Sequence, residues 1–145
     1  FTKLYGMAGV RLGYCLCSDT ELLARMRAAG QPWAVSSLAQ AAGIAALDET
    51  EYVAKVRALI EAQRPVLADG LRALGLRVIE GRANYLLFRA PEALGEALRR
   101  KGAVLRSCGN YPGLDASWYR TAVRTENENR QLLALLAETL PEVAQ

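Results

Sequence analysis

The stretch LGLRVIEGRANYLLFR, residues 74–89, marks the point at which the hydrophobic pattern of the chain changes its period. Before it, apolar residues recur with helical spacing, and Gly75 stands where a helix C-terminus favours glycine. After it, residues 76–79 and 84–89 are short, apolar and rich in residue types that favour strands. We therefore expect a helix to end near Leu74 and two strands to follow it.

The next segment predicts one more helix and two more strands. Residues 91–101 begin with proline and are followed by Gly102, an arrangement typical of a short helix. Residues 103–106 and 118–124 have the composition of strands, and a loop that contains proline and glycine separates them.

A final helix is predicted by the capping box that Thr125 and Glu128 form ahead of an apolar run. Five leucines supply the apolar face of this helix: Leu132, Leu133, Leu135, Leu136 and Leu140. The order from residue 76 onward is then β-β-α-β-β-α. We expect residues 76–145 to form one compact α+β domain with a sheet of three or four strands.

A long helical tract, residues 36–75, precedes this domain. A serine pair at its start is a typical N-cap, residues 48–50 predict a break in it, and Pro65 predicts a kink. We interpret the tract as a connector to a separate, larger domain.

The first 35 residues predict a strand and a short helix. Residues 10–17 have the apolar pattern of a strand, and Asp19 is an N-cap signal for a helix over 19–29. The chain begins at Phe1 and not at a methionine, so we expect it to be part of a longer protein.

Composition and charge exclude several classes of protein. With 52% hydrophobic and 23% charged residues, the chain has globular composition and is not disordered. Its net charge of +3 is scattered along the chain, so we expect no nucleic-acid partner. The apolar runs are shorter than the roughly 20 residues of a membrane span, so we expect no membrane partner.

The chain contains no histidine, which excludes Ser-His-Asp and Cys-His nucleophile systems and argues against a metal site. Cys15, Cys17 and Cys108 are odd in number and irregularly spaced. This pattern favours a reducing compartment over a disulfide framework, and we expect the protein to be cytoplasmic.

Residues 2–14, TKLYGMAGVRLGY, resemble the cofactor-lysine segment of fold-type I pyridoxal-phosphate enzymes, within them the histidinol-phosphate aminotransferase branch. Their spacing alone would favour the interpretation of Lys3 and Arg11 as two solvated basic residues. The resemblance implies that Lys3 forms the Schiff base with pyridoxal 5'-phosphate, and that Arg11 and the Thr2 hydroxyl contact the cofactor phosphate. A lysine amine, a guanidinium and a hydroxyl suit that chemistry.

A second resemblance, to the small-domain end of the same family, lies in residues 105–114 and 118–129. The form of these residues most closely resembles that of the threonine-phosphate decarboxylases of cobalamin synthesis. It implies that Arg120 binds the substrate α-carboxylate and that Arg106 lies near the substrate phosphate. The alternative for each is an exposed arginine with no ligand.

The resemblance implies an α/β fold in three parts: residues 1–35 end the large cofactor-binding domain, 36–75 connect, and 76–145 form the small domain. It implies a dimeric enzyme that acts on a phosphorylated amino-acid-type substrate, as a threonine-phosphate decarboxylase or, alternatively, as a histidinol-phosphate aminotransferase. A third hypothesis is that these 145 residues alone are an inactive fragment that binds the cofactor incompletely or not at all. The strand over 10–17 would belong to a sheet whose other strands precede it, so we expect this segment to pack poorly.

Overall fold

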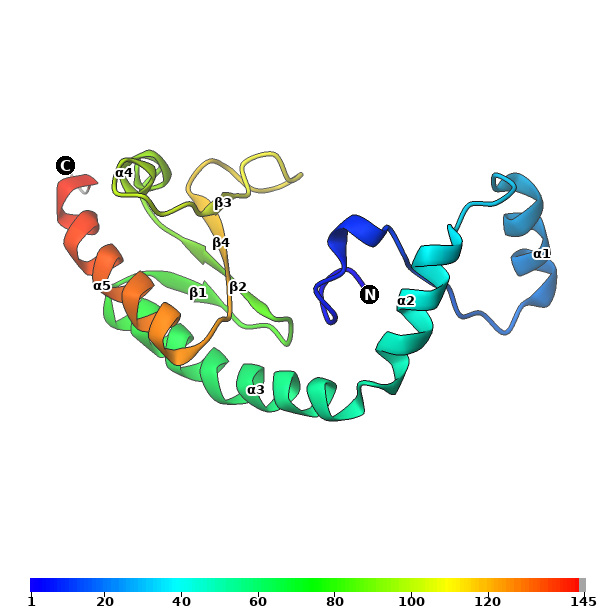
Figure 1. Cartoon of the computed structure of the whole chain (residues 1–145). Helices are drawn as coiled ribbons and strands as arrows, with labels where there is room; N and C mark the ends of the chain where they lie inside the picture. The colour runs from blue at the N-terminus through cyan, green and yellow to red at the C-terminus, as the bar shows by residue number, and fades with distance from the viewer. Residues whose placement is uncertain (144–145) are drawn as a thin grey trace. The chain divides into compact units, whose positions relative to one another are not determined.

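The computed structural model describes residues 1–143. The chain divides into two compact units between Val56 and Arg57 (Figure 1). The long helix α3, Thr50–Ala73, contributes residues to both of them.

The first unit is helical. After a 3₁₀ turn η1, Ala8–Val10, it contains α1, Thr20–Ala29, and α2, Ser37–Asp48, followed by the first turns of α3. Glu49 interrupts the helical tract between α2 and α3, so the break predicted over 48–50 is confirmed.

Both predicted N-caps of this unit are confirmed. The Asp19 carboxylate accepts a hydrogen bond from the Leu22 N–H at 2.9 Å, and the Ser36 hydroxyl accepts one from the Ala39 N–H at 3.2 Å. Each side chain satisfies one of the amide groups that a helix N-terminus leaves without a partner.

The prediction of a strand over residues 10–17 is wrong. Residues 11–17 adopt no strand, and within the described part of the chain no other strand pairs with them. A strand gains its stability from a hydrogen-bonded neighbour, and apolar pattern alone does not supply one. Tyr14 and Leu16 are 75% and 86% exposed, so these two side chains pack against little of the described chain.

The second unit contains a four-stranded antiparallel sheet in the order β1-β2-β4-β3 (Figure 1). Its strands are β1, Arg77–Ile79, β2, Tyr85–Arg89, β3, Arg106–Ser107, and β4, Trp118–Ala122; its further helices are α4, Leu94–Arg100, and α5, Glu126–Val143. The predicted order β-β-α-β-β-α is confirmed.

The largest differences from the predicted boundaries lie on either side of α4, where the chain forms turns. Residues 91–93 form a turn, and α4 begins only at Leu94. At the other end, Gly102 has a φ of +85°, and the Ala103 N–H donates to the Leu98 carbonyl oxygen at 2.9 Å. This bond ends α4 and uses Ala103, the residue at which we expected a strand to begin. The strand β3 therefore starts only at Arg106.

Gly75 ends α3 as predicted. Its φ is +79°, its N–H donates to the Arg72 carbonyl at 2.9 Å, and the Leu76 N–H donates to the Leu71 carbonyl at 3.2 Å. These two bonds form a Schellman motif, which requires a left-handed residue and therefore favours glycine.

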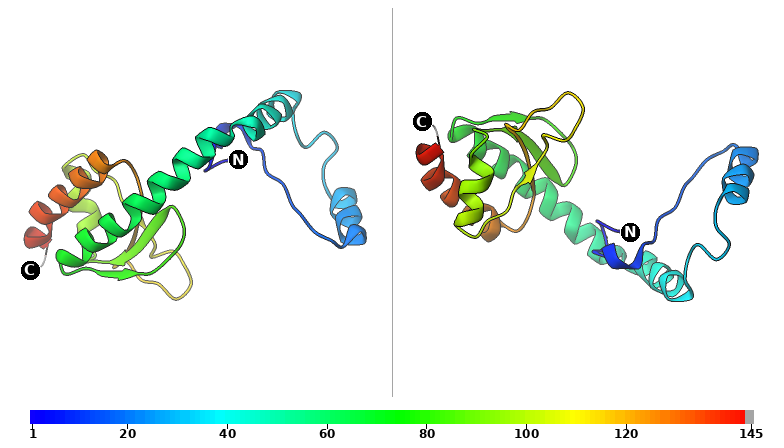
Figure 2. Two further views of the ribbon diagram at one scale, coloured as in Figure 1. Left: turned by 90° about the horizontal axis from the view of Figure 1, so that it is seen from below. Right: turned by 90° about the horizontal axis from the view of Figure 1, so that it is seen from above.

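The core of the second unit lies between one face of the sheet and the helices. Leu86, Phe88 and Tyr119 are buried on that face. They pack with buried leucines from α3, α4 and α5: Leu67, Leu71, Leu94, Leu98 and Leu136. Figure 2 shows α5 beside the C-terminal part of α3, where Gly70 approaches Leu133 closely.

Strand alternation turns the remaining side chains toward the opposite face of the sheet. Along β2 and β4, buried residues alternate with less buried ones, among them Leu87 and Arg120. The less buried side chains of β2 and β4 therefore lie on this second face.

Candidate functional site

The predicted site residues fall into two groups, one in each unit. Thr2, Lys3 and Arg11 belong to the first unit, and Arg106 and Arg120 belong to the second. The contacts within each unit define the geometry of its own group of residues.

Lys3 lies in a tight turn at the start of the first unit. The Tyr5 N–H donates to the Phe1 carbonyl at 3.2 Å, and the Gly6 N–H donates to the Lys3 carbonyl at 3.3 Å. Gly6 has a φ of +66°, which glycine adopts at little cost. The turn leaves the Lys3 side chain exposed and that of Thr2 half-buried.

Aromatic rings surround this turn. The rings of Phe1 and Tyr5 stack with centroids 5.4 Å apart, and the ring of Tyr5 stacks on that of Tyr52 at 6.5 Å. Such contacts are worth about 0.5–1.5 kcal/mol each beyond the area they bury. They hold the backbone on both sides of Lys3 against the first turn of α3.

Arg11 ends η1 in a left-handed conformation, with φ 54° and ψ 45°. Its guanidinium folds back, and Nη1 donates to the Ala8 carbonyl oxygen at 3.0 Å. The side chain is exposed, and its other N–H groups are directed to no carboxylate within residues 1–143. Residues 1–18 contain no Asp or Glu, so this segment is uniformly basic.

Arg106 and Arg120 are direct partners across β3 and β4. Partners in an antiparallel pair share one face of the sheet, so both arginines lie on the face opposite the core. Arg120 is half-buried and Arg106 is exposed. In the described part of the chain, neither forms an ion pair.

The loop between these arginines is fixed by its own hydrogen bonds. The Cys108 N–H donates to the Trp118 carbonyl at 2.8 Å, and the Cys108 side chain is buried. Asp115 accepts from both the backbone and the hydroxyl of Ser117. These bonds, the hydroxyl first, lower the pKa of Asp115, and nearby Arg89 lowers it further.

Tyr85 is a residue that the sequence analysis missed. Its ring centroid lies 4.6 Å from the guanidinium carbon of Arg120. The signal that could have found it is the alternation along β2, which puts Tyr85 on the same face as Leu87, the register partner of Arg120.

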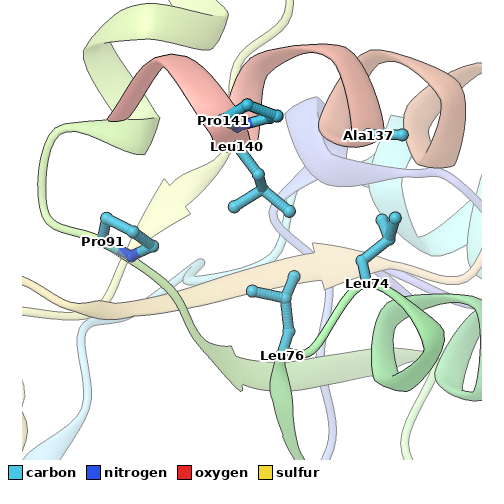
Figure 3. A pocket seen from close by; sticks show the side chains of 6 residues that line it. All are labelled: Leu74, Leu76, Pro91, Ala137, Leu140 and Pro141. Atoms are coloured by element: carbon cyan, nitrogen blue, oxygen red, sulfur yellow. The ribbon is translucent and has the colours of Figure 1, made fainter. Parts of the chain in front are cut away.

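Figure 3 shows an apolar hollow elsewhere in the second unit. Its lining consists of Leu74, Leu76, Pro91, Ala137, Leu140 and Pro141. None of the predicted site residues contributes to it, and its side chains offer no group that could donate or accept a proton.

No helix within residues 1–143 combines the length and the apolar character that crossing a membrane requires. Over the same residues, no cluster of three or more Cys, Asp or Glu side chains could hold a metal ion.

The sequence is similar to two kinds of curated enzyme. It is 39% identical, over 99% of its length, to the threonine-phosphate decarboxylase of Salmonella typhimurium, and it covers 40% of that protein. It is 40% identical, over 98% of its length, to the histidinol-phosphate aminotransferase of Symbiobacterium thermophilum, and it covers 39% of that protein. The chain thus spans about two fifths of the length of these relatives.

The chain is also similar to solved structures of such enzymes. The chain matches the histidinol-phosphate aminotransferase of Clostridium acetobutylicum with a TM-score of 0.90 and 31% identity, over 97% of this chain and 44% of that one. It matches the histidinol-phosphate aminotransferase of Sinorhizobium meliloti, solved in complex with pyridoxal-5'-phosphate, with a TM-score of 0.74 and 26% identity, over 99% of this chain and 39% of that one.

The family model described as aminotransferase class I and II matches residues 1–136, nearly the whole chain. The fold-type I α/β assignment is confirmed by the structural match. The chain belongs to the pyridoxal-phosphate-dependent aminotransferase class I and II family.

Proposed function

We propose that the chain is the C-terminal part of an enzyme that uses pyridoxal 5'-phosphate to decarboxylate threonine phosphate or a closely similar substrate. One observation carries the proposal: Arg106 and Arg120 are cross-strand partners on one open face and have no carboxylate partner among residues 1–143. A small substrate with both a carboxylate and a phosphate needs two cations at a fixed, short separation.

The donor set of the first unit fits the cofactor. Thr2 offers a hydroxyl and Arg11 a guanidinium, the two kinds of donor that bind a phosphate well. Lys3 offers an exposed primary amine, the group that condenses with an aldehyde. Residues 1–18 themselves contain no Asp or Glu, and the acidic side chain that lines a hollow with Tyr5 and Met7 is that of Glu49.

Bound pyridoxal phosphate acts as an electron sink that stabilises negative charge at the substrate Cα. In the proposal, Lys3 holds the cofactor covalently and afterwards moves a proton at Cα. Thr2 and Arg11 hold the cofactor phosphate and so fix the position of the ring above which the substrate reacts.

The two arginines of the second unit orient the substrate. Arg120 binds the α-carboxylate through two parallel N–H donors, and Arg106 binds the phosphate at the other end. Since the bond that lies perpendicular to the cofactor ring is the one that breaks, the placement of the carboxylate decides between decarboxylation and proton loss.

The alternative is a histidinol-phosphate aminotransferase, which transfers the amino group to 2-oxoglutarate. The 40% identity with one such enzyme and the TM-score of 0.90 with another support it. In that case Arg106 would still bind the substrate phosphate, and Arg120 would bind the carboxylate of the keto-acid partner.

The deciding experiment gives the complete protein that contains this chain each substrate separately, with added cofactor. Release of CO₂ and aminopropanol phosphate from threonine phosphate supports the decarboxylase. Glutamate formed from histidinol phosphate and 2-oxoglutarate, without CO₂ release from threonine phosphate, overturns it and establishes the aminotransferase.

The remaining parts of the proposal concern the whole protein. Residues 1–35 would complete a cofactor-binding domain, 36–75 would connect, and 76–145 would form the small domain. The whole protein would be a cytoplasmic homodimer that acts on small phosphorylated substrates and on neither nucleic acid nor membranes. Residues 1–145 alone would be inactive, and absorbance of lysine-bound cofactor in this chain would argue against that.

A further inference from the structure

The open face of the sheet places an aromatic ring directly against Arg120. Tyr85 lies opposite Ala122, and Arg120 lies two residues before Ala122 on β4, on the same face of the sheet. The guanidinium carbon of Arg120 lies 4.6 Å from the ring centroid, inside the roughly 6 Å range of a cation–π interaction. Tyr85 is 40% exposed, so water reaches only part of this contact.

The electrostatics of the strand pair explain why such a contact matters. Arg106 stands directly opposite Arg120, and like charges at opposed positions repel each other. The usual remedy, a carboxylate beside the arginine, would engage the N–H groups that a ligand needs. A ring engages the flat face of the guanidinium instead and leaves its N–H edge free.

From this geometry we infer that Tyr85 is a positioning residue, which holds the Arg120 guanidinium with its donor edge available to the substrate carboxylate. The inference rests on the proposed function, since it assumes that Arg120 binds that carboxylate. Tyr85 itself touches neither substrate nor cofactor in this assignment, and it acts only through Arg120.

The experiment compares two substitutions of Tyr85 in the complete, cofactor-loaded protein. Tyr85→Leu removes the ring, and we expect KM for the carboxylate substrate to rise about two- to fivefold with kcat nearly unchanged. Tyr85→Phe keeps the ring, and we expect it to retain the wild-type KM. Tyr85→Thr serves as a second ring-free variant, because threonine favours strands, and the same rise in KM is expected.

Trp118 provides a matched control. Trp118 lies on β4 with Arg120 and on the same face of the sheet, and its ring centroid lies 5.7 Å from the guanidinium carbon of Arg77 on β1. Trp118→Leu therefore removes the contact with Arg77, which is of the same kind as that between Tyr85 and Arg120. No ligand is proposed for Arg77. We expect this variant to keep the wild-type KM, which would separate positioning of Arg120 from a general disturbance of the sheet.

A second comparison separates this inference from the proposed function. Arg120→Gln should raise KM by itself, and adding Tyr85→Leu to it should raise KM no further, because the two residues act as one unit. If Arg120→Gln raises KM and both ring-free variants at Tyr85 do not, the positioning role is overturned and the proposed function stands. If Arg120→Gln leaves KM unchanged, the proposed role of Arg120 fails. A rise in Tyr85→Phe equal to that in Tyr85→Leu would overturn the role of the ring.

Discussion

The side-chain amide of Asn129 forms two hydrogen bonds with the backbone of a single residue, Arg124. Its Oδ1 accepts from the Arg124 N–H at 3.1 Å, and its Nδ2 donates to the Arg124 carbonyl oxygen at 2.9 Å. Nδ2 also donates to the Gln63 Oε1 on α3 at 3.3 Å, and Asn129 is 2% exposed. One buried amide thus joins the chain after β4 to the start of α5 and to α3.

Replacing Asn129 by alanine should therefore destabilise the fold. The change leaves the N–H and C=O of Arg124 without this partner in a place that water reaches poorly. We expect the free energy of unfolding to fall by about 1–3 kcal/mol, the usual cost of leaving a buried donor or acceptor without its partner. Urea unfolding of the 145-residue chain, followed by circular dichroism, measures it.

Asn127 is the control for this change. It lies in the same first turn of α5, and it is exposed. Asn127→Ala should leave the unfolding midpoint nearly unchanged. Equal midpoints for the two alanine variants would show that the contacts of Asn129 with Arg124 add nothing to stability.

The hydrogen bonds that the Glu128 carboxylate accepts at the start of α5 predict a dependence of stability on pH. Hydrogen bonds from Arg124 and then from Thr125 lower the pKa of Glu128 from 4.5 to about 2. Because the folded-state pKa is the lower one, the carboxylate contributes stability above about pH 4.5, and this contribution is lost as the pH falls toward 2.

We therefore expect Glu128→Gln to lower the unfolding midpoint at pH 7 and to have a smaller effect at pH 3. The salt bridge with Arg124, 2.8 Å from Nε to Oε1, and the bond from the Thr125 N–H are what the variant weakens. Glu61→Gln, an exposed change on α3, controls for the loss of one carboxylate. A difference between Glu128→Gln and the wild type that grows on acidification would contradict the assignment.

The sequence predicts the second unit well because its signals are local. The Schellman glycine Gly75, the capping residues Thr125 and Glu128, and the change of period after Leu74 each act within a few residues. The structure forms the elements where these signals stand. The largest shifts of a boundary, at the two ends of the α4 segment, occur where residues are used for turns, as at Gly102.

The same local reasoning fails for residues 10–17 and for Tyr85. A strand needs a partner that sequence pattern does not name, and within the described residues this segment has none. The contact between Tyr85 and Arg120 joins residues 35 positions apart and depends on the β2–β4 register, which no single strand encodes. The roles of Lys3, Thr2, Arg11, Arg106 and Arg120 stay predictions, since they concern a cofactor and a substrate.

Lys3→Ala gives the most direct test of the cofactor assignment. In the complete protein, it should remove the absorbance of lysine-bound cofactor and nearly all turnover, because no other amine replaces the covalent attachment. Lys55→Ala is the control, since Lys55 is exposed and pairs only with Glu51 at 2.7 Å within residues 1–143. Wild-type absorbance in Lys3→Ala would place the attachment at another lysine.

Arg11→Gln should separate cofactor binding from covalent attachment. The variant loses the guanidinium proposed to hold the phosphate, while Lys3 remains. We expect the cofactor to bind at least tenfold more weakly, with its lysine-bound absorbance recovered at high cofactor concentration. Titration of the cofactor-free protein with pyridoxal phosphate measures this, and an unchanged dissociation constant would assign the phosphate to other donors.

Arg106→Gln tests the substrate phosphate site under either proposed reaction. Threonine phosphate and histidinol phosphate both carry a phosphate, so the ratio of kcat/KM for the phosphorylated substrate to that for its dephosphorylated form measures the contact. Since Arg106 is exposed, we expect this ratio to fall by about 10- to 30-fold, toward the lower end of what losing a charge partner costs. Arg99→Gln, at an exposed arginine on α4 near Glu96, should keep the wild-type ratio. Because the dephosphorylated substrate corrects for any effect on folding or on the cofactor, an equal ratio in wild type and Arg106→Gln would exclude Arg106 from the phosphate site.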